Sequence, residues 1–149
     1  MTSNTHTVQK IENGYVIDHI PPGKNVHILK LLGLHKSTHE IYSGRNVPSK
    51  KHGTKDFLKI VGAEFSDLDF NRIALVAPNA TVNRIENFSL TEKQRIAIPE
   101  RIENILVCPN VNCIANHEPF IKTVFTRAGS RFTCAFCEYT FTDEEIAFL

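Results

Sequence analysis

The sequence reads Cys-Pro-Asn-Val-Asn-Cys at residues 108–113 and Cys-Ala-Phe-Cys at residues 134–137, and these stretches hold all four cysteines of the chain. Two close pairs separated by about twenty residues are typical of a tetrahedral zinc site, in which each pair forms a tight turn, or knuckle, that presents two thiolates. We therefore predict one zinc ion with four ligands, which are Cys108, Cys113, Cys134 and Cys137.

Two other interpretations of these cysteines are a pair of disulfides and four unrelated core thiols. No cysteine precedes Cys108 in a chain of 149 residues, and random placement rarely gives such clustering. Four protein ligands leave no open position at the metal for activating water, so the predicted ion is structural rather than catalytic. His117 lies near the second cysteine and is the alternative ligand if one thiolate does not bind.

The composition is that of a globular chain with nearly balanced charge. Hydrophobic residues make up 42% and charged residues 22%, and 17 Lys+Arg against 16 Asp+Glu give a net charge of +1. This balance argues against bulk electrostatic attraction to nucleic acid, although a local basic patch stays open. No apolar run approaches the roughly 18 residues of a membrane span, and the polar first ten residues lack a secretory apolar core. With reduced, metal-bound cysteines, these features predict a cytoplasmic protein without a membrane or nucleic-acid partner.

Strands and helices are predicted for the residues before Pro99. Ser66 with Asp69 three residues later indicates a capping box at a helix start, and Pro78 ends that helix. The predicted elements are a strand at 14–20, a helix at 26–32, strands at 40–47 and 56–61 joined by a loop at 48–53, a helix at 66–77, and strands at 80–88 and 94–98. The first six have the β-α-β-β-α-β order of a ferredoxin-like domain, in which helices cover one face of an antiparallel sheet.

From residue 100 the pattern changes to short strands around the cysteines, at 105–108, 124–134 and 139–141. About 50 residues are too few to be held by apolar burial alone, so zinc should supply much of the folding free energy. The sequence therefore predicts an α+β chain of two domains, a ferredoxin-like domain at 1–99 and a small all-β, zinc-ribbon-like domain at 100–149.

The first domain contains no phosphate-binding loop and no metalloprotease or serine-hydrolase motif. Asp18 and His19 lie in an otherwise apolar strand, and Lys59 is predicted on the face opposite Leu58. His19 is compatible with a structural histidine and Lys59 with a solvated lysine. Asn83 could bond a nucleobase edge or serve its strand, and Lys93 alone carries no signal. Two lysines and a histidine on one sheet face would suit a polyphosphate. The pattern alone neither predicts nor excludes such a site.

Five motifs run through nearly the whole chain in order: VIDHIP at 16–21, KDFLKI at 55–60, APNATVNRIEN at 77–87, PERIENILVCPNVNC at 99–113 and CAFC at 134–137. Together they resemble the regulatory chain of aspartate carbamoyltransferase, the enzyme of an early committed step in pyrimidine synthesis. The combination of PERIEN with this cysteine spacing is highly specific to that family.

The resemblance implies a non-catalytic subunit that forms a homodimer through its first domain and docks on trimers of catalytic chains through its zinc domain. ATP would activate, and CTP and UTP would inhibit, at one shared site. Carried over by position, the nucleotide-binding residues would be Ile11, Asp18, His19, Lys59, Asn83, Ile85, Phe88, Leu90 and Lys93. Asp18 and His19 would contact the sugar and phosphates, the two lysines the ribose and phosphates, and the remaining residues the base and sugar.

Four positions depart from the family pattern. Phe88 and Leu90 stand where the best-known member has tyrosine and valine, and Lys10 occupies a small apolar position beside the base pocket. Ala135 replaces a lysine that helps to hold the catalytic chain. Because of Lys10, the resemblance does not predict the relative strengths of the effects of ATP, CTP and UTP. Because of Ala135, we expect a weaker contact with the catalytic chain.

Two other functions fit parts of the pattern. The β-α-β-β-α-β order also occurs in RNA-recognition motifs, but residues 55–61 offer one phenylalanine and lack the Lys/Arg-Gly-Phe/Tyr opening of an RNA-binding strand. A small enzyme with a structural zinc is disfavoured because the sequence carries no nucleophile–base signature.

Overall fold

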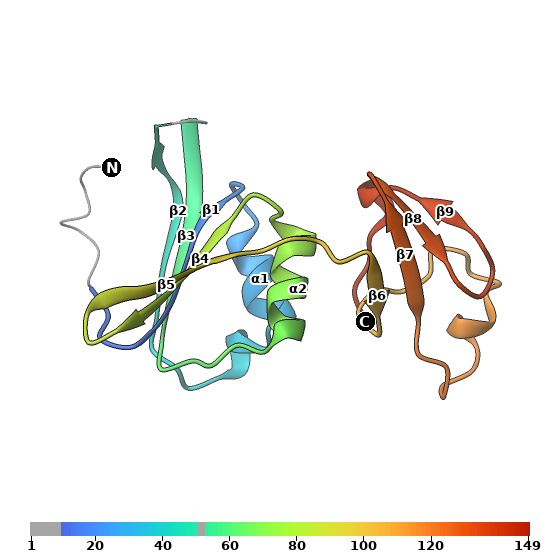
Figure 1. The fold of residues 1–149 in the computed structure, drawn as a ribbon, viewed down its shortest axis with the longest axis horizontal. Coiled ribbons are helices and arrows are strands. Elements are labelled where there is room, and N and C mark those ends of the chain that lie inside the picture. The colour runs from blue at the N-terminus through green and yellow to red at the C-terminus, as the bar shows by residue number, and fades with distance from the viewer. Residues whose placement is uncertain (1–9, 51–52) are drawn as a thin grey trace. The chain divides into compact units, whose positions relative to one another are not determined.

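The computed structural model describes residues 10–50 and 53–149, so the polar stretch at 1–9 and residues 51–52 of the predicted loop lie outside it. The chain divides into two compact units, of which the first ends at Ile98 and the second spans Pro99–Leu149 (Figure 1). Within the described residues, none of the helices has the length and apolar character that crossing a membrane requires.

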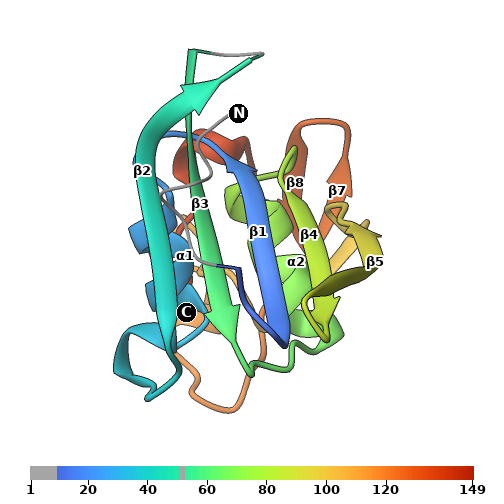
Figure 2. The same ribbon diagram turned by 90° about the vertical axis from the view of Figure 1, so that its left-hand side faces the viewer.

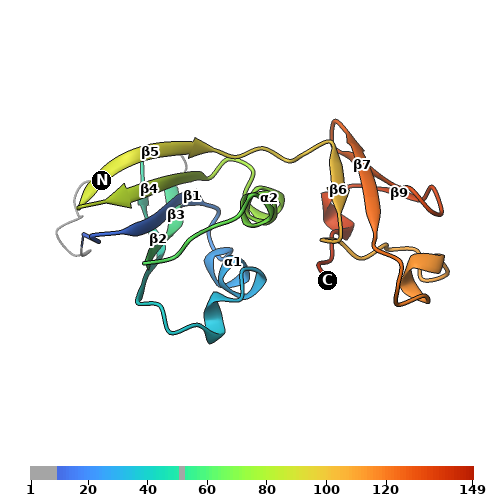
Figure 3. The same ribbon diagram turned by 60° about the horizontal axis from the view of Figure 1, so that its bottom comes forward.

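The first unit is a five-stranded antiparallel sheet with two α-helices on one face (Figure 3). Its elements are β1 (Gly14–Ile20), α1 (Asn25–Leu31), the 3-10 helix η2 (Leu34–Lys36), β2 (Ile41–Ser49), β3 (Gly53–Val61), α2 (Asp67–Val76), β4 (Thr81–Glu86) and β5 (Ser89–Arg95). The strand order is β2-β3-β1-β4-β5 (Figure 2). The first four strands in this order form the predicted ferredoxin-like arrangement, which the structure confirms.

Strand alternation places the core of this unit between the sheet and the helices. Ile17, Leu58 and Val82 from the three central strands are fully buried, together with Ile28 of α1 and Ile73 of α2. Every second residue of these strands points to the opposite face, which the helices leave uncovered. This uncovered face, called the open face below, carries the residues that sequence reasoning assigned to ligand binding.

The predicted capping box of α2 is confirmed. The Asp69 N–H donates to Ser66 Oγ at 3.3 Å, and the Ser66 N–H donates to the Asp69 carboxylate at 3.0 Å. These two bonds satisfy N–H groups that have no partner inside the helix. The helix ends at Val76, two residues before Pro78.

Two predictions in the first unit are wrong in detail. β2 and β3 extend into the range predicted as a loop at 48–53, with Ser49 pairing Gly53. The last strand is Ser89–Arg95 rather than 94–98, and it forms a hairpin with β4 through Asn87 and Phe88, whose φ angles are 53° and 66°. Two consecutive left-handed residues match the type of turn that joins paired strands, and this turn ends the predicted strand 80–88 early.

The second unit is all-β apart from short 3-10 turns. It contains β6 (Arg101–Glu103), η3 (Ile114–Asn116), β7 (Val124–Ala128), β8 (Arg131–Cys134), β9 (Thr140–Phe141) and η4 (Asp143–Glu145), with the strand order β6-β7-β8-β9. Its core is aromatic: the Phe141 ring stacks on Phe132 at 5.4 Å between centroids and meets Phe125 edge-on at 5.5 Å. The predicted small all-β domain is therefore confirmed.

The strand predicted at 105–108 is wrong. The first strand of this unit is β6, and Leu106 forms only an isolated bridge with Phe148. Leu106 is fully buried, and its carbonyl accepts a hydrogen bond from the hydroxyl of Thr123 at 2.6 Å. The apolar run at 105–107 thus fills the core as irregular backbone that leads into the first cysteine pair.

Candidate functional site

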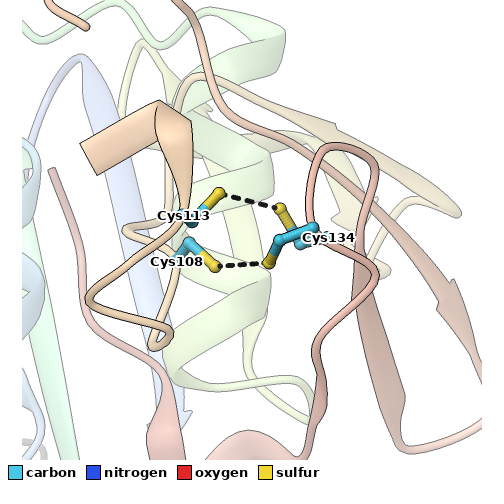
Figure 4. Close-up of side chains that lie close together, drawn as sticks. Cys108, Cys113 and Cys134 are labelled. Atoms are coloured by element: carbon cyan, nitrogen blue, oxygen red, sulfur yellow. Dashed lines mark hydrogen bonds between the residues drawn. The ribbon is translucent and has the colours of Figure 1, made fainter. Parts of the chain in front are cut away.

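The four cysteine sulfurs form one cluster in which all Sγ atoms lie within 4.8 Å of one another (Figure 4). The Sγ atoms of Cys108 and Cys137 are 3.6 Å apart, and those of Cys113 and Cys134 are 3.7 Å apart. A disulfide requires about 2.05 Å, so no disulfide is present among the four. A tetrahedron of sulfurs about 2.3 Å from a zinc ion has edges of about 3.8 Å, which these separations match.

Backbone N–H groups are aimed at three of the sulfurs in the same local pattern. The N–H groups of Asn110, Ala115 and Tyr139 donate to the cysteine two positions earlier, which are Cys108, Cys113 and Cys137. Glu138, directly after Cys137, has a left-handed φ of 64° that forms the tight turn of the second knuckle. Hydrogen bonds to sulfur favour its charged form, so these N–H groups oppose the effect of burial on the pKa of the three thiols.

The first knuckle is held closed by Asn116, whose side-chain NH₂ donates to the carbonyl oxygens of Cys108 at 3.0 Å and Asn110 at 2.7 Å. The His117 ring nitrogen Nε2 lies 2.8 Å from the carbonyl oxygen of Val111, and His117 is outside the sulfur cluster. The arrangement therefore favours four cysteine ligands over the alternative that includes His117.

The thiols of the cluster differ in acidity. Burial raises the pKa of Cys108 and of Cys113. Burial also raises the pKa of Cys137, but hydrogen bonds from the Asn110 side chain, the Tyr139 backbone and the neighbouring thiols outweigh it and lower this pKa to about 7. A metal ion binds thiolates, so its binding must displace the protons of Cys108 and Cys113.

The open face of the first unit brings together residues from all five strands. Lys59 lies opposite both Tyr42 and Val16, and Asn83 lies opposite both Val16 and Lys93. Directly opposite residues share one face of a sheet. The two predicted lysines and the predicted asparagine therefore lie in one row across the sheet.

Lys59 is half-buried in this row. Burial lowers its pKa, the charge of Asp18 opposes that change, and the charge of Lys10 adds to it. An anion on the open face would relieve the repulsion between Lys10 and Lys59. Lys59 is therefore only partly exposed to solvent.

Asn83 contains an unusual acceptor. Its side-chain oxygen Oδ1 is buried and has no hydrogen-bond partner within residues 10–50 and 53–149. A buried polar atom without a partner costs about 1–3 kcal/mol. Asn83 lies on the open face in the same row as the two lysines, so rotation of its amide would offer this oxygen to a ligand donor.

One end of the open face continues into a cavity of about 760 Å³. Its basic lining consists of His19, Lys55, Lys93 and Arg95. Lys55 forms an ion pair with Asp18 at 2.9 Å, and the His19 ring lies 3.4 Å from the hydroxyl of Thr81. His19 has a left-handed φ of 60° because it lies in a bulge of β1, where two residues oppose one on β3.

The opposite end of the open face is apolar. Ile85 lies opposite Gly14 on β1 and Leu90 on β5, and Ile11 is buried. Phe88 and Leu90 are 60% and 55% exposed, so the structure places them at the rim of this end rather than inside a pocket.

Sequence reasoning missed several lining residues of the cavity, which are Ser49, Thr54, Lys55, Thr81 and Arg95. The alternation of residues 55–61 could have placed Lys55 on the same face as Lys59. Arg95 could not be placed without the β5 pairing, in which it lies opposite Thr81.

Comparisons with known proteins agree in both units. Residues 6–97 match the family described as "Aspartate carbamoyltransferase regulatory chain, allosteric domain", and residues 100–147 match the family described as its "metal binding domain". Relatives named "Aspartate carbamoyltransferase regulatory chain" include one from a Vibrio species, 45% identical over 97% of this chain and 96% of the relative. Others come from Pyrococcus abyssi, at 45% identity over 93% and 94%, and from Methanopyrus kandleri, at 42% over 93% and 92%.

Proposed function

The chain belongs to the aspartate carbamoyltransferase regulatory chain family, whose members are non-catalytic subunits, and we propose that it controls catalytic chains in response to ATP, CTP and UTP. The observation that carries the proposal is the arrangement of the open face. A basic cavity is followed by a row with two lysines and the Asn83 amide oxygen, which has no partner among the described residues, and then by an apolar end. The family match replaces the alternatives of an RNA-binding module and a small enzyme.

The order of these three regions, which are the cavity, the lysine row and the apolar end, supports one orientation for a nucleoside triphosphate. The phosphates lie at the cavity, where the compact ammonium of Lys93 and the forked guanidinium of Arg95 suit phosphate oxygens. The base lies toward Ile85, where apolar side chains suit its faces. Asn83 lies between these regions, and its Oδ1 accepts from the ribose or from an exocyclic amino group of the base.

The remaining carried-over residues fit the same orientation. Asp18 lies beside Lys55 and opposite Thr81, at the phosphate end, and His19 lines the cavity. Ile11, Phe88 and Leu90 belong to the base end. Lys59 meets the phosphates or ribose from the middle row. All three nucleotides share the triphosphate and sugar, so one site can bind activator and inhibitors in competition.

We further propose that the sulfur cluster binds zinc. Zinc takes four thiolates in tetrahedral geometry at structural sites, and the Sγ separations of 3.6 and 3.7 Å fit that geometry. When bound, the ion supplies folding free energy and no open coordination position for catalysis. Four reduced cysteines also fit a reducing compartment such as the cytoplasm.

The metal-binding unit is the proposed contact with the catalytic chain. Apolar side chains next to the cysteines are exposed, including Val111 at 73%, Ile114 at 52% and Phe136 at 44%. They lie on the two knuckles, so the metal fixes the shape of the surface that carries them. Exposed apolar groups on a small domain are typical of protein interfaces.

The first unit is the proposed site of homodimer formation. β2 is an edge strand with one hydrogen-bonding side unpaired in the sheet. An exposed strand edge offers backbone donors and acceptors to a second copy.

Ala135 lies in the second knuckle, where we expect the contact with the catalytic chain to be weaker than in relatives with lysine.

Regulation of this kind requires differential affinity, since a ligand that binds two global states equally shifts nothing. A coupling free energy of about 1–3 kcal/mol would suffice. The test mixes the full chain with the catalytic trimer of the same organism and measures the rate against aspartate concentration. We expect CTP to raise and ATP to lower the half-saturating aspartate concentration. A mixture that assembles without any nucleotide response would contradict the regulatory role.

A further inference from the structure

Asp56 is a fully buried carboxylate that no ligand-binding role accounts for. Its Oδ2 accepts hydrogen bonds from the N–H groups of Gly23 at 2.8 Å and Asn25 at 3.4 Å. Its Oδ1 accepts from the N–H of Asn46 at 2.9 Å. The carboxylate therefore joins the turn after β1 to the edge strand β2.

Asn25 extends this connection and is also fully buried. Its side-chain NH₂ donates to the hydroxyl of Ser43 at 2.7 Å and lies 3.5 Å from the carbonyl oxygen of Gly44. The two residues form one network, named here the Asn25–Asp56 network, that holds β2 within its bulge and at the two residues before it. In that bulge Arg45 and Asn46 together oppose Asp56, and Asn46 has a left-handed φ of 56°.

The other side of the network borders the ligand cavity. Pro21 and Pro22 line the cavity and precede Gly23, and the Lys24 N–H closes their turn on the Pro21 carbonyl at 3.0 Å. Asp56 pairs with Ile20 of β1, directly after the bulge that contains His19. Through the N–H of Gly23, the carboxylate therefore holds the Pro21–Pro22 part of the cavity wall from the side away from the cavity.

Lys55 precedes Asp56 on β3, and because side chains alternate along a strand the two point to opposite faces. Lys55 lines the cavity and pairs with Asp18, whereas Asp56 enters the network. A phosphate in the cavity would compete with Asp18 for the Lys55 ammonium. Leaving a buried carboxylate unpaired is costly, so a shift of the β3 backbone at Lys55 would carry with it the N–H groups that Asp56 holds.

We propose that Asp56 is a positioning residue that couples anion binding in the cavity to the backbone of edge strand β2 at Arg45–Val47. The inference rests on the proposed nucleotide site and adds a route from that site to the strand edge proposed for homodimer formation. Asp56 touches no ligand in this proposal and acts through Gly23, Asn25 and Asn46.

The experiment measures amide hydrogen exchange of residues 41–49 in the full chain with and without saturating CTP. We expect CTP to change the exchange rate there at least twofold in the wild-type protein. Asp56→Asn keeps the shape of the side chain but removes its charge and one acceptor. We expect this variant to bind CTP and to lose the response of β2.

Asp69→Asn is the matched control, because it makes the same chemical change in the capping box of α2, away from the cavity. It should lose stability and keep the β2 response. Ser43→Ala is a milder second variant that removes only the bond from Asn25. It should reduce the β2 response, and it provides the test if Asp56→Asn does not fold.

Unchanged exchange at 41–49 when wild-type protein binds CTP overturns the inference, as does a full response in Asp56→Asn or, if that variant is unfolded, in Ser43→Ala. Calorimetry separates this result from failure of the proposed function. If the wild-type chain binds neither CTP nor ATP, the nucleotide site is wrong, and inorganic triphosphate then serves as the probe of the cavity. No β2 response to bound triphosphate, or no binding of triphosphate, overturns the coupling as well.

Discussion

Asn83 on β4 lies directly opposite Lys93 on β5. This pairing places a buried amide oxygen, which has no partner in the part of the chain that the structure describes, beside an exposed ammonium group on the same sheet face. Lys59 lies in the same row, two strands away from Asn83, with Val16 between them. The row therefore offers two cations and one acceptor to a ligand that carries both negative charge and hydrogen-bond donors. A nucleoside triphosphate has this combination.

Lys93→Ala and Lys59→Ala should each weaken binding of CTP and ATP by about tenfold or more, because each removes a charge-assisted contact of about 1.5–3 kcal/mol. Calorimetric titration measures the affinities. Lys30→Ala, at the last turn of α1 on the helix layer, is the control and should bind normally. Zinc content should be the same in all three variants. Wild-type affinity in both Lys93→Ala and Lys59→Ala would remove these residues from the site.

Part of this site could be predicted from residue patterns because the signals are local. The alternation of residues 57–61 places Lys59 on the open face, and the spacing of the cysteines predicts their cluster. Ser66 and Asp69 form the predicted capping box because the pairing depends only on a three-residue separation.

The pairing of Asn83 with Lys93 could not be predicted, because it depends on a strand without a hydrophobic pattern. Six of the seven residues of β5 are exposed, so apolar alternation does not mark it. Its turn places Phe88 at a positive φ, where glycine or asparagine is the usual signal. Apolar residues at 105–107 gave the opposite error, since burial of Leu106 does not require a strand.

Asn83→Ala should lower the affinity for ATP and CTP more than the affinity for UTP. Adenine and cytosine each carry an exocyclic amino group that donates hydrogen bonds, whereas the corresponding group of uracil is an acceptor. The lost contact is worth about 0.5–1.5 kcal/mol, so we expect a change of about two- to tenfold. Competition titrations of the three nucleotides provide the measurement. Equal losses for all three would mean that Asn83 contacts the ribose instead of the base.

Removal of the metal should unfold the second unit and leave the first unit folded. The core of residues 99–149 is small, and metal affinity at a structural site is folding free energy. A mercurial displaces the metal, a chromophoric chelator counts the released zinc, and the near-ultraviolet circular dichroism of the phenylalanine-rich core reports unfolding. Retained assembly with catalytic trimers after complete metal loss would contradict this expectation.

Metal affinity should fall as pH falls. The pKa of Cys108 and of Cys113 is raised by burial, so these thiols hold protons that zinc must displace. Protons therefore compete with the metal, and zinc should leave more readily at about pH 6 than at about pH 8. Cys113→Ser should release zinc across this whole range, because it removes one of the four ligands. A pH-independent affinity in the wild-type chain would show that the thiols lose their protons before the metal binds.

The isolated chain should bind ATP and CTP competitively, form a homodimer and show no carbamoyl transfer. Nucleotides should change the rate only after assembly with catalytic trimers, since population shift needs two global states and a dimer without catalytic chains has none to bias.

A sizing column should show a larger species when trimers are added. Phe136→Ser, on the exposed second knuckle, should weaken that species without releasing zinc. Lys10→Ala should change the ratio of CTP to ATP affinity, because Lys10 places its charge near Lys59. Carbamoyl transfer by the purified chain, or failure to associate with the cognate trimer, would refute the assignment as a regulatory subunit.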